Sequence, residues 1–233
     1  MHSTFKHKKR LAFIAFAVIL CICVVLFFVA HSKKVAAVER MQSKYCAEIS
    51  VLLSKVAKSG YSSKDARFAL GYLNEDAIPE VFVCFGDHGR DTIQIFTYLP
   101  EEQAVKNLGD FSSRGSFLFQ EKQSVVVSTY GNQGFFPMVY EKVTPSQREI
   151  LAVEANYIDI EDQTHYYISY PYSGTQETLF ETLSAAETTK ELYQQKAALL
   201  RGTYTNPKTI EYSQMIPYTE ENFKSTFTSL LQK

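Results

Sequence analysis

Hydrophobic residues are concentrated in one uninterrupted run near the start of the chain. Residues 11–30 (LAFIAFAVILCICVVLFFVA) contain no charged side chain. At about 1.5 Å per residue, an α-helix of this length crosses a hydrocarbon layer of roughly 30 Å. A cleaved secretory signal usually has a shorter apolar stretch, of about 7 to 15 residues. The pattern therefore favours a retained transmembrane signal-anchor, with a cleaved signal as the alternative.

Basic residues flank this run on both sides. They are Lys6, Lys8, Lys9 and Arg10 before it, and Lys33, Lys34, Arg40 and Lys44 after it. The positive-inside rule applies to short loops, whereas long domains cross the membrane largely regardless of their charge. We therefore expect a cytoplasmic basic head at residues 1–10 and an extracytoplasmic position for residues 31–233. The opposite orientation is the alternative.

A helical period follows the apolar run, over residues 35–58. Its apolar positions recur at three- and four-residue steps, with charged residues between them, and Gly60 is a natural stop. The positions are Val38, Met41, Tyr45, Ile49, Leu52 and Val56. A stalk or dimerising coil would need more clean heptads than this segment contains. The pattern favours an amphipathic helix packed on its own domain.

Short apolar runs rich in Val, Ile, Phe and Tyr replace the helical period after residue 66. The predicted strands are residues 68–73, 80–85, 92–98, 116–120, 124–130, 137–143, 150–160 and 165–170. Their connections carry turn-forming residues and are too short for crossover helices. The spacing therefore predicts an antiparallel β meander.

Two helices are predicted after the strands. Ser184 and Glu187 have the spacing of a capping box that would start a helix running to about Arg201, with Gly202 ending it. Thr219 is the expected cap of a last helix at residues 220–231. The residues expected to face the core are Leu192, Ala197, Leu200, Phe223, Phe227 and Leu230.

These elements predict an α+β fold with an N-terminal transmembrane helix, an amphipathic helix, an antiparallel β meander and C-terminal helices. We divide the chain into a cytoplasmic basic head (1–10), a transmembrane signal-anchor (11–30), a juxtamembrane helix (31–60) and an extracytoplasmic α+β domain (61–233).

Charge and cysteine content narrow the possible functions. Residues 35–233 carry all 25 acidic and 18 of the 24 basic residues, a formal charge of −7. That balance disfavours binding to nucleic acid or to an anionic surface. Cys46 and Cys84 lie in apolar contexts, which favours buried thiols over a disulfide. Cys21 and Cys23 fall inside the apolar run, where a cysteine behaves as a small apolar residue.

The densest polar cluster lies at residues 74–80. Hard cations such as Ca²⁺ take six to eight oxygen ligands, which acidic residues at alternate turn positions can supply. Asn74, Asp76 and Glu80 are the candidate metal ligands. The alternative is a structural β-turn, because Asn and Asp hydrogen-bond their own backbone there and Pro79 stiffens the exit. Ala77 also stands where tight calcium loops use glycine.

The same segment carries a family resemblance. Residues 68–83 (FALGYLNEDAIPEVFV) resemble the YxDxDxxPEL-like strand-turn-strand of poorly characterised extracytoplasmic proteins of Gram-positive bacteria. Residues 93–98 and 108–111 extend the likeness, which covers about residues 66–130. Members are typically anchored by a lipid or by one membrane helix, so the resemblance implies a bacterial cell-surface location. It implies no particular activity.

Two further segments offer other candidate sites. Asp87, His88 and Asp91 form a small potential acid/base group, which a loop between two strands explains equally well. The loop at residues 130–137 could present Phe135 and Phe136 to a partner or tuck them into the core. The chain has no nucleophile elbow, Ser-x-x-Lys motif or phosphate-binding glycine loop.

The resulting functional hypothesis is a membrane-anchored extracytoplasmic domain that binds a protein or small ligand at the cell surface without catalysis. The alternative is a surface hydrolase or metal-dependent enzyme that uses the acidic region at residues 74–91.

Overall fold

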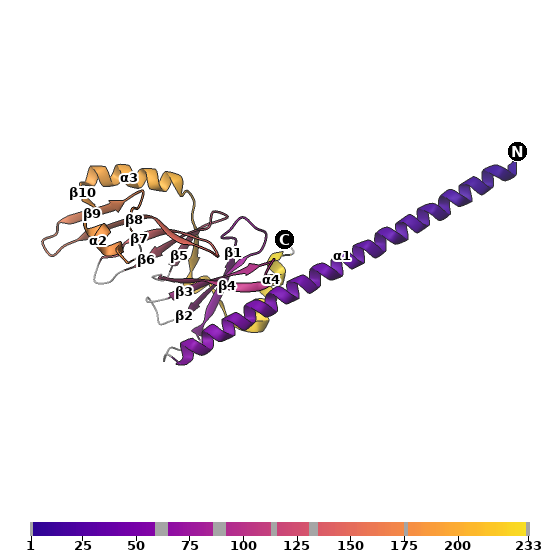
Figure 1. Ribbon diagram of the computed structural model, residues 1–233, viewed down its shortest axis with the longest axis horizontal. Helices are drawn as coiled ribbons and strands as arrows, with labels where there is room; N and C mark the ends of the chain where they lie inside the picture. The colour runs from indigo at the N-terminus through magenta and orange to yellow at the C-terminus, as the bar shows by residue number, and fades with distance from the viewer. Residues whose placement is uncertain are drawn as a thin grey trace. The chain divides into compact units, whose positions relative to one another are not determined.

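The computed structural model describes residues 2–58, 65–85, 92–112, 116–130, 135–174 and 177–231. These residues form an α+β fold with two antiparallel sheets, which confirms the predicted fold class (Figure 1). The chain divides into two compact units, residues 1–43 and residues 44–233.

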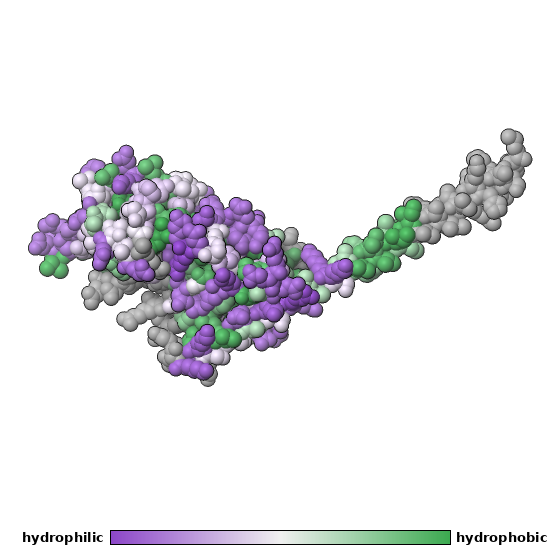
Figure 2. Space-filling view, in the orientation of Figure 1, coloured by the Kyte–Doolittle hydropathy of each residue, from purple (hydrophilic) through white to green (hydrophobic). Residues whose placement is uncertain are grey.

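The first unit consists of the N-terminal part of helix α1 (His2–Lys58). Its large apolar side chains from Ile19 to Val29 are exposed, and they form the apolar surface of α1 in Figure 2. In the described part of the chain, α1 is the one helix long and apolar enough to cross a membrane. A membrane anchor and a signal sequence both have this form. The predicted apolar and amphipathic helices are continuous because residues 2–58 contain no Gly or Pro.

The second unit begins with the last turns of α1. Tyr45, Ile49, Leu52 and Val56 are buried, at the three- and four-residue spacing seen in the sequence. The Tyr45 ring lies 5.6 Å from the Phe227 ring, between centroids. The amphipathic segment therefore packs on its own domain, as predicted.

The first sheet has the strand order β12-β1-β2-β3-β4, and its neighbouring strands are antiparallel. Its members are β1 (Arg67–Gly71), β2 (Glu80–Phe85), β3 (Thr92–Leu99), β4 (Ala104–Ser112) and β12 (Ile216–Pro217). One face carries Phe68, which packs against Phe223 of helix α4 (Glu220–Leu231) with 5.5 Å between ring centroids. The other face lies against the second sheet.

The second sheet has the order β10-β9-β8-β7-β6-β5-β11, again antiparallel. Its members are β5 (Ser116–Gln120), β6 (Val125–Thr129), β7 (Met138–Val143), β8 (Arg148–Ile158), β9 (Thr164–Ser169), β10 (Glu187–Thr188) and β11 (Lys208–Glu211). Helices α2 (Leu179–Ser184) and α3 (Lys190–Thr203) pack against it. In Figure 1, α3 runs along this sheet.

Aromatic side chains fill the space between the two sheets. Phe82 of the first sheet lies 5.0 Å from Phe119 and 5.8 Å from Phe117 of the second, between ring centroids. Phe111 and Cys84 belong to the same buried cluster. Cys46 and Cys84 are both buried thiols, as the sequence predicted.

The predicted capping box is wrong. Ser184 is the last residue of α2, and Glu187 belongs to β10, where it pairs with Tyr167 of β9. Helix α3 instead starts after Thr189, whose hydroxyl accepts a hydrogen bond from the Leu192 N–H at 3.3 Å. Glu187 is therefore part of a strand pair and cannot cap a helix together with Ser184.

The buried face of α3 also differs from the prediction. Tyr193, Ala197 and Leu200 are buried, whereas Leu192 is 42% exposed. The stripe follows four- and three-residue steps from Tyr193, which place Leu192 on the neighbouring face. Gly202 lies inside the helix, which ends at Thr203.

The last helix matches its prediction. The Thr219 hydroxyl accepts a hydrogen bond from the Asn222 N–H at 3.0 Å. Phe223 and Phe227 are fully buried, and Leu230 is half-buried. Among the residues that the structure describes, four strands were not predicted, namely β4, β10, β11 and β12.

Candidate functional site

The predicted metal ligands lie together in a turn between β1 and β2. Asn74 donates its side-chain N–H to Glu80 Oε1 at 2.7 Å, and its Oδ1 accepts the Asp76 N–H at 2.9 Å. The Asp76 carboxylate accepts the Ile78 N–H at 2.7 Å. The bonds from the Asp76 and Ile78 N–H groups, each to the side chain two residues earlier, are those of consecutive Asx-type turns.

Glu80 is buried at the start of β2, with a relative exposure of 1%. Its carboxyl oxygens also accept hydrogen bonds from the Leu73 N–H at 2.7 Å and the Thr97 hydroxyl at 3.0 Å. Burial raises the pKa of Glu80 to about 7, because desolvation of the charged form outweighs these hydrogen bonds. When Glu80 is protonated, its O–H can donate to the Thr97 hydroxyl oxygen.

The raised pKa predicts a pH-dependent stability. Because the native state binds the Glu80 proton more tightly than the unfolded chain, this stabilisation is full below pH 4.5 and is lost as the pH rises through about 7. We expect the free energy of unfolding to fall by about 3 kcal/mol over this window. Chemical denaturation at a series of pH values measures the slope.

A matched pair of variants isolates the group. Glu80→Gln should remove most of the slope, whereas Glu75→Gln, at an exposed position of the same turn, should leave it unchanged. A Glu80→Gln slope equal to that of the wild type would contradict the assignment.

Calcium binding by Asn74, Asp76 and Glu80 stays a prediction. A cation would compete with the hydrogen bonds that these side chains make within the turn. Among the described residues, no three His, Cys, Asp or Glu side chains form a group that could hold a metal ion. The other acidic candidates, Asp87, His88 and Asp91, lie outside the described residues.

Phe135, the candidate anchor of the loop at residues 130–137, packs into the domain. Its ring lies 5.4 Å from the Tyr157 ring and 5.7 Å from the Tyr167 ring, between centroids and nearly perpendicular. Both partners belong to the second sheet, beside the cluster that α2 covers. The structure thus supports the core interpretation for Phe135, while residues 131–134 lie outside the described part.

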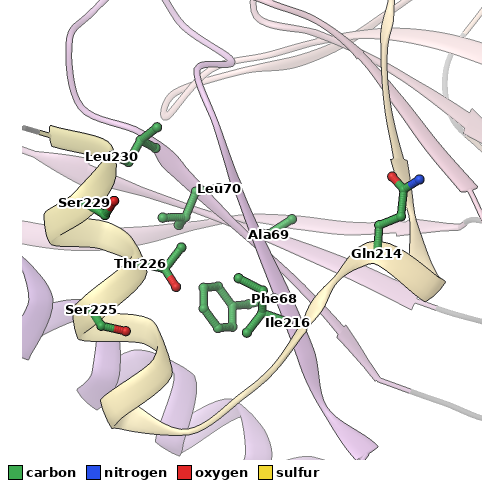
Figure 3. Close-up of a pocket in the computed structure, with 9 residues that line it drawn as sticks. All are labelled: Phe68, Ala69, Leu70, Gln214, Ile216, Ser225, Thr226, Ser229 and Leu230. Atoms are coloured by element: carbon green, nitrogen blue, oxygen red, sulfur yellow. The ribbon is translucent and has the colours of Figure 1, made fainter. Parts of the chain in front are cut away.

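A groove lies between β1 and helix α4. It has a volume of about 580 Å³ and is open to solvent along one side. Figure 3 shows its lining residues, Phe68, Ala69, Leu70, Gln214, Ile216, Ser225, Thr226, Ser229 and Leu230. In this view, Leu70 faces the helix that carries Thr226 and Leu230. The groove therefore has apolar sides and a row of hydroxyl groups.

The edge of β1 is open along this groove. The Tyr218 N–H donates to the Ala66 carbonyl at 2.9 Å, and Phe68 is paired with Ile216. Because alternate residues of a strand direct their backbone groups to the same side, the N–H and C=O of Leu70 also face this edge. β12 contains only Ile216 and Pro217, and among the described residues no backbone group pairs with Leu70 on this side.

The segment before β12 is held away from the open edge. Residues Tyr212–Gln214 form the 3₁₀ helix η2, whose last turn closes through the Met215 N–H and the Tyr212 carbonyl at 3.1 Å. Arg67 donates to the Met215 carbonyl at 3.0 Å, and its guanidinium lies 5.0 Å from the centre of the Tyr212 ring. These contacts keep residues 212–214 out of strand geometry, so the pairing with β1 stops at Phe68.

Sequence reasoning missed this groove because its parts are distant in the chain. β1 and β12 are separated by most of the domain, and Ile216-Pro217 is too short to read as a strand. Pro217 was the one available signal, since a residue without an N–H is confined to edge strands.

Comparisons with known protein families, with curated proteins and with solved structures found no match.

Proposed function

We propose that this chain is a single-pass membrane protein whose extracytoplasmic domain binds an extended peptide segment of another protein, without catalysis. The observation that carries the proposal is the open edge of β1 beside the groove.

The apolar surface of α1 supports the membrane location. Residues 11–30 are long enough to cross the hydrocarbon layer, and four basic residues precede them with no acidic residue. This pattern favours the head at residues 1–10 in the cytoplasm and the acidic domain outside it. The resemblance of residues 68–83 to anchored extracytoplasmic proteins of Gram-positive bacteria agrees with a bacterial cell-surface location.

The open strand edge supports an extended peptide as the occupant. An unpaired N–H and C=O at a sheet edge are a template for another strand, and many domains bind peptides by this strand addition. A peptide lying antiparallel to β1, in line with β12, would pair one residue with both backbone groups of Leu70.

The groove indicates which peptide side chains would fit. Successive side chains of an added strand point to opposite faces of the sheet, so alternate residues would face α4. There they would meet Leu70, Ile216 and Leu230, beside the hydroxyl groups of α4. We therefore expect a preference for a β-branched or other apolar residue at the position that faces the groove. The formal charge of −7 on residues 35–233 further favours neutral or basic flanking residues.

Selection of peptides against the full chain in lipid nanodiscs tests this function. Ser229 is exposed and lines the groove, so Ser229→Trp should fill the groove and weaken selected peptides at least about tenfold, or about 1.4 kcal/mol. Lys224→Trp places the same side chain on α4 outside the groove lining and should leave binding unchanged. Equal binding by the two variants, or no selected peptide, would contradict the proposal.

A further inference from the structure

A second cavity lies on the face of the second sheet that α3 covers, where that helix ends. Its volume is about 440 Å³, within the range of small-molecule sites. Leu118, Val127 and Tyr140 stand side by side on neighbouring strands and form its floor. The segment from Tyr204 to Pro207, which leads from α3 to β11, forms part of its wall.

A buried carboxylate binds Arg201, the charged residue in the lining of this cavity. Glu154 of β8 is 2% exposed, and its oxygens accept hydrogen bonds from the Tyr140 hydroxyl at 2.9 Å and the Tyr193 hydroxyl at 3.0 Å. Arg201 Nη2 lies 3.3 Å from Glu154 Oε2. Glu154 thus positions the Arg201 guanidinium through one nitrogen, and Glu154 itself does not line the cavity.

Most of the Arg201 guanidinium remains open. Its side chain is 64% exposed, and its described contact to Glu154 uses one of the five N–H donors of the group. Guanidinium donors in a planar fork match the two oxygens of a carboxylate. Arg201 is also the one charged residue among the described residues that line the cavity. Because Glu154 already balances the charge of Arg201, the remaining N–H donors suit a carboxylate, which two of them can bind, better than a more highly charged phosphate, which usually takes several donors.

The rest of the lining suits a ligand that has a flat apolar ring and a hydrogen-bond donor. The rings of Tyr140 and Tyr204 pack 5.6 Å apart, and Met138 adds an adaptable apolar wall. Gln120 is 2% exposed and donates to the Tyr204 carbonyl at 3.2 Å. Gln120 also lines the cavity, where a ligand hydroxyl or N–H can donate to its side-chain carbonyl oxygen.

From this arrangement we infer that the cavity at the end of α3 is a binding site for a small aromatic monocarboxylate. The ligand carboxylate pairs with Arg201, and its ring lies against Tyr140, Tyr204 and Met138. This site is separate from the groove at β1, since no residue lines both.

Ligand-observed saturation-transfer NMR on the full chain in detergent micelles tests the site, with 4-hydroxybenzoate as the probe and 4-hydroxybenzamide as its neutral counterpart. The acid should bind saturably, and the amide at least about tenfold more weakly. Arg201→Gln should weaken the acid by a similar factor, because it removes the charge-assisted hydrogen bonds to the ligand carboxylate. Lys190→Gln, at an exposed position at the start of α3, should leave its affinity unchanged.

A second variant separates loss of the site from a change in folding. Thr205 is exposed at the rim of the cavity, and Thr205→Trp should block the acid while leaving the thermal unfolding midpoint within a few degrees of the wild type. Equal affinity for acid and amide would overturn the inference. Undiminished binding to Thr205→Trp, or no binding of the acid to the wild type, would overturn it as well.

Discussion

Replacing Arg148 with Met should lower the free energy of unfolding by about 3–5 kcal/mol, because it leaves the buried Glu141 carboxylate without its cation. Arg148 binds Glu141 through two nitrogens, at 2.7 and 3.0 Å, and Glu141 is 1% exposed. The guanidinium also donates to the Tyr130 hydroxyl at 2.9 Å and to the Asp110 carbonyl of β4 at 3.1 Å. The arginine therefore links the two sheets.

Two controls separate this effect from a general loss of charge. Removing both partners in Glu141→Leu/Arg148→Met should recover most of the lost stability, since no buried charge is then left uncompensated. Lys208→Met breaks an exposed ion pair, Lys208 to Glu121 at 3.6 Å, and should cost less than about 1 kcal/mol. Urea denaturation followed by near-ultraviolet circular dichroism of the tyrosines measures all four proteins. A cost for Arg148→Met as small as that for Lys208→Met would contradict the prediction.

The second large effect is expected at Phe223 of α4. This ring is fully buried and lies 5.5 Å from the rings of Phe68 and Phe227 and 6.0 Å from that of Tyr45, between centroids. Phe223→Ala would leave a cavity where α1, α4 and β1 meet, and should cost about 3–5 kcal/mol. The measurement is again the free energy of unfolding in urea.

Phe180 provides the matched control for this truncation. It lies on α2 and is 53% exposed, so Phe180→Ala removes the same atoms but opens little or no cavity. We expect a cost below about 1 kcal/mol. Equal costs for the two variants would show that the packing of α4 on β1 contributes less than the structure indicates.

Strands with a clear alternating or β-branched pattern were predictable from the sequence. Residues 80–85 and 116–120 form β2 and β5 with the predicted bounds. β4 (AVKNLGDFS) was missed because Lys106, Asn107, Gly109 and Asp110 interrupt its apolar pattern, and its position is set by pairing with β3. Such pairing depends on residues outside the local segment, so propensity alone does not reveal it.

One candidate site could likewise be predicted from the sequence, and the other could not. The cluster of Asn74, Asp76 and Glu80 was visible because its members are close in the chain, and the structure brings them together. The groove at β1 had no local signal, because Phe68, Ile216 and Ser229 come from distant segments. Its open edge depends on where β12 begins, which tertiary contacts of Arg67 and Tyr212 decide.

Amide hydrogen exchange at Leu70 shows whether a peptide binds as an added strand of the first sheet. The Leu70 N–H faces the open edge of β1, so it should exchange faster in the peptide-free chain than the N–H of Ala69, which faces β2. Binding of a selected peptide as an added strand should slow exchange at Leu70 by at least about tenfold and leave Ala69 unchanged. A bound peptide that does not protect Leu70 would contradict strand addition at this edge.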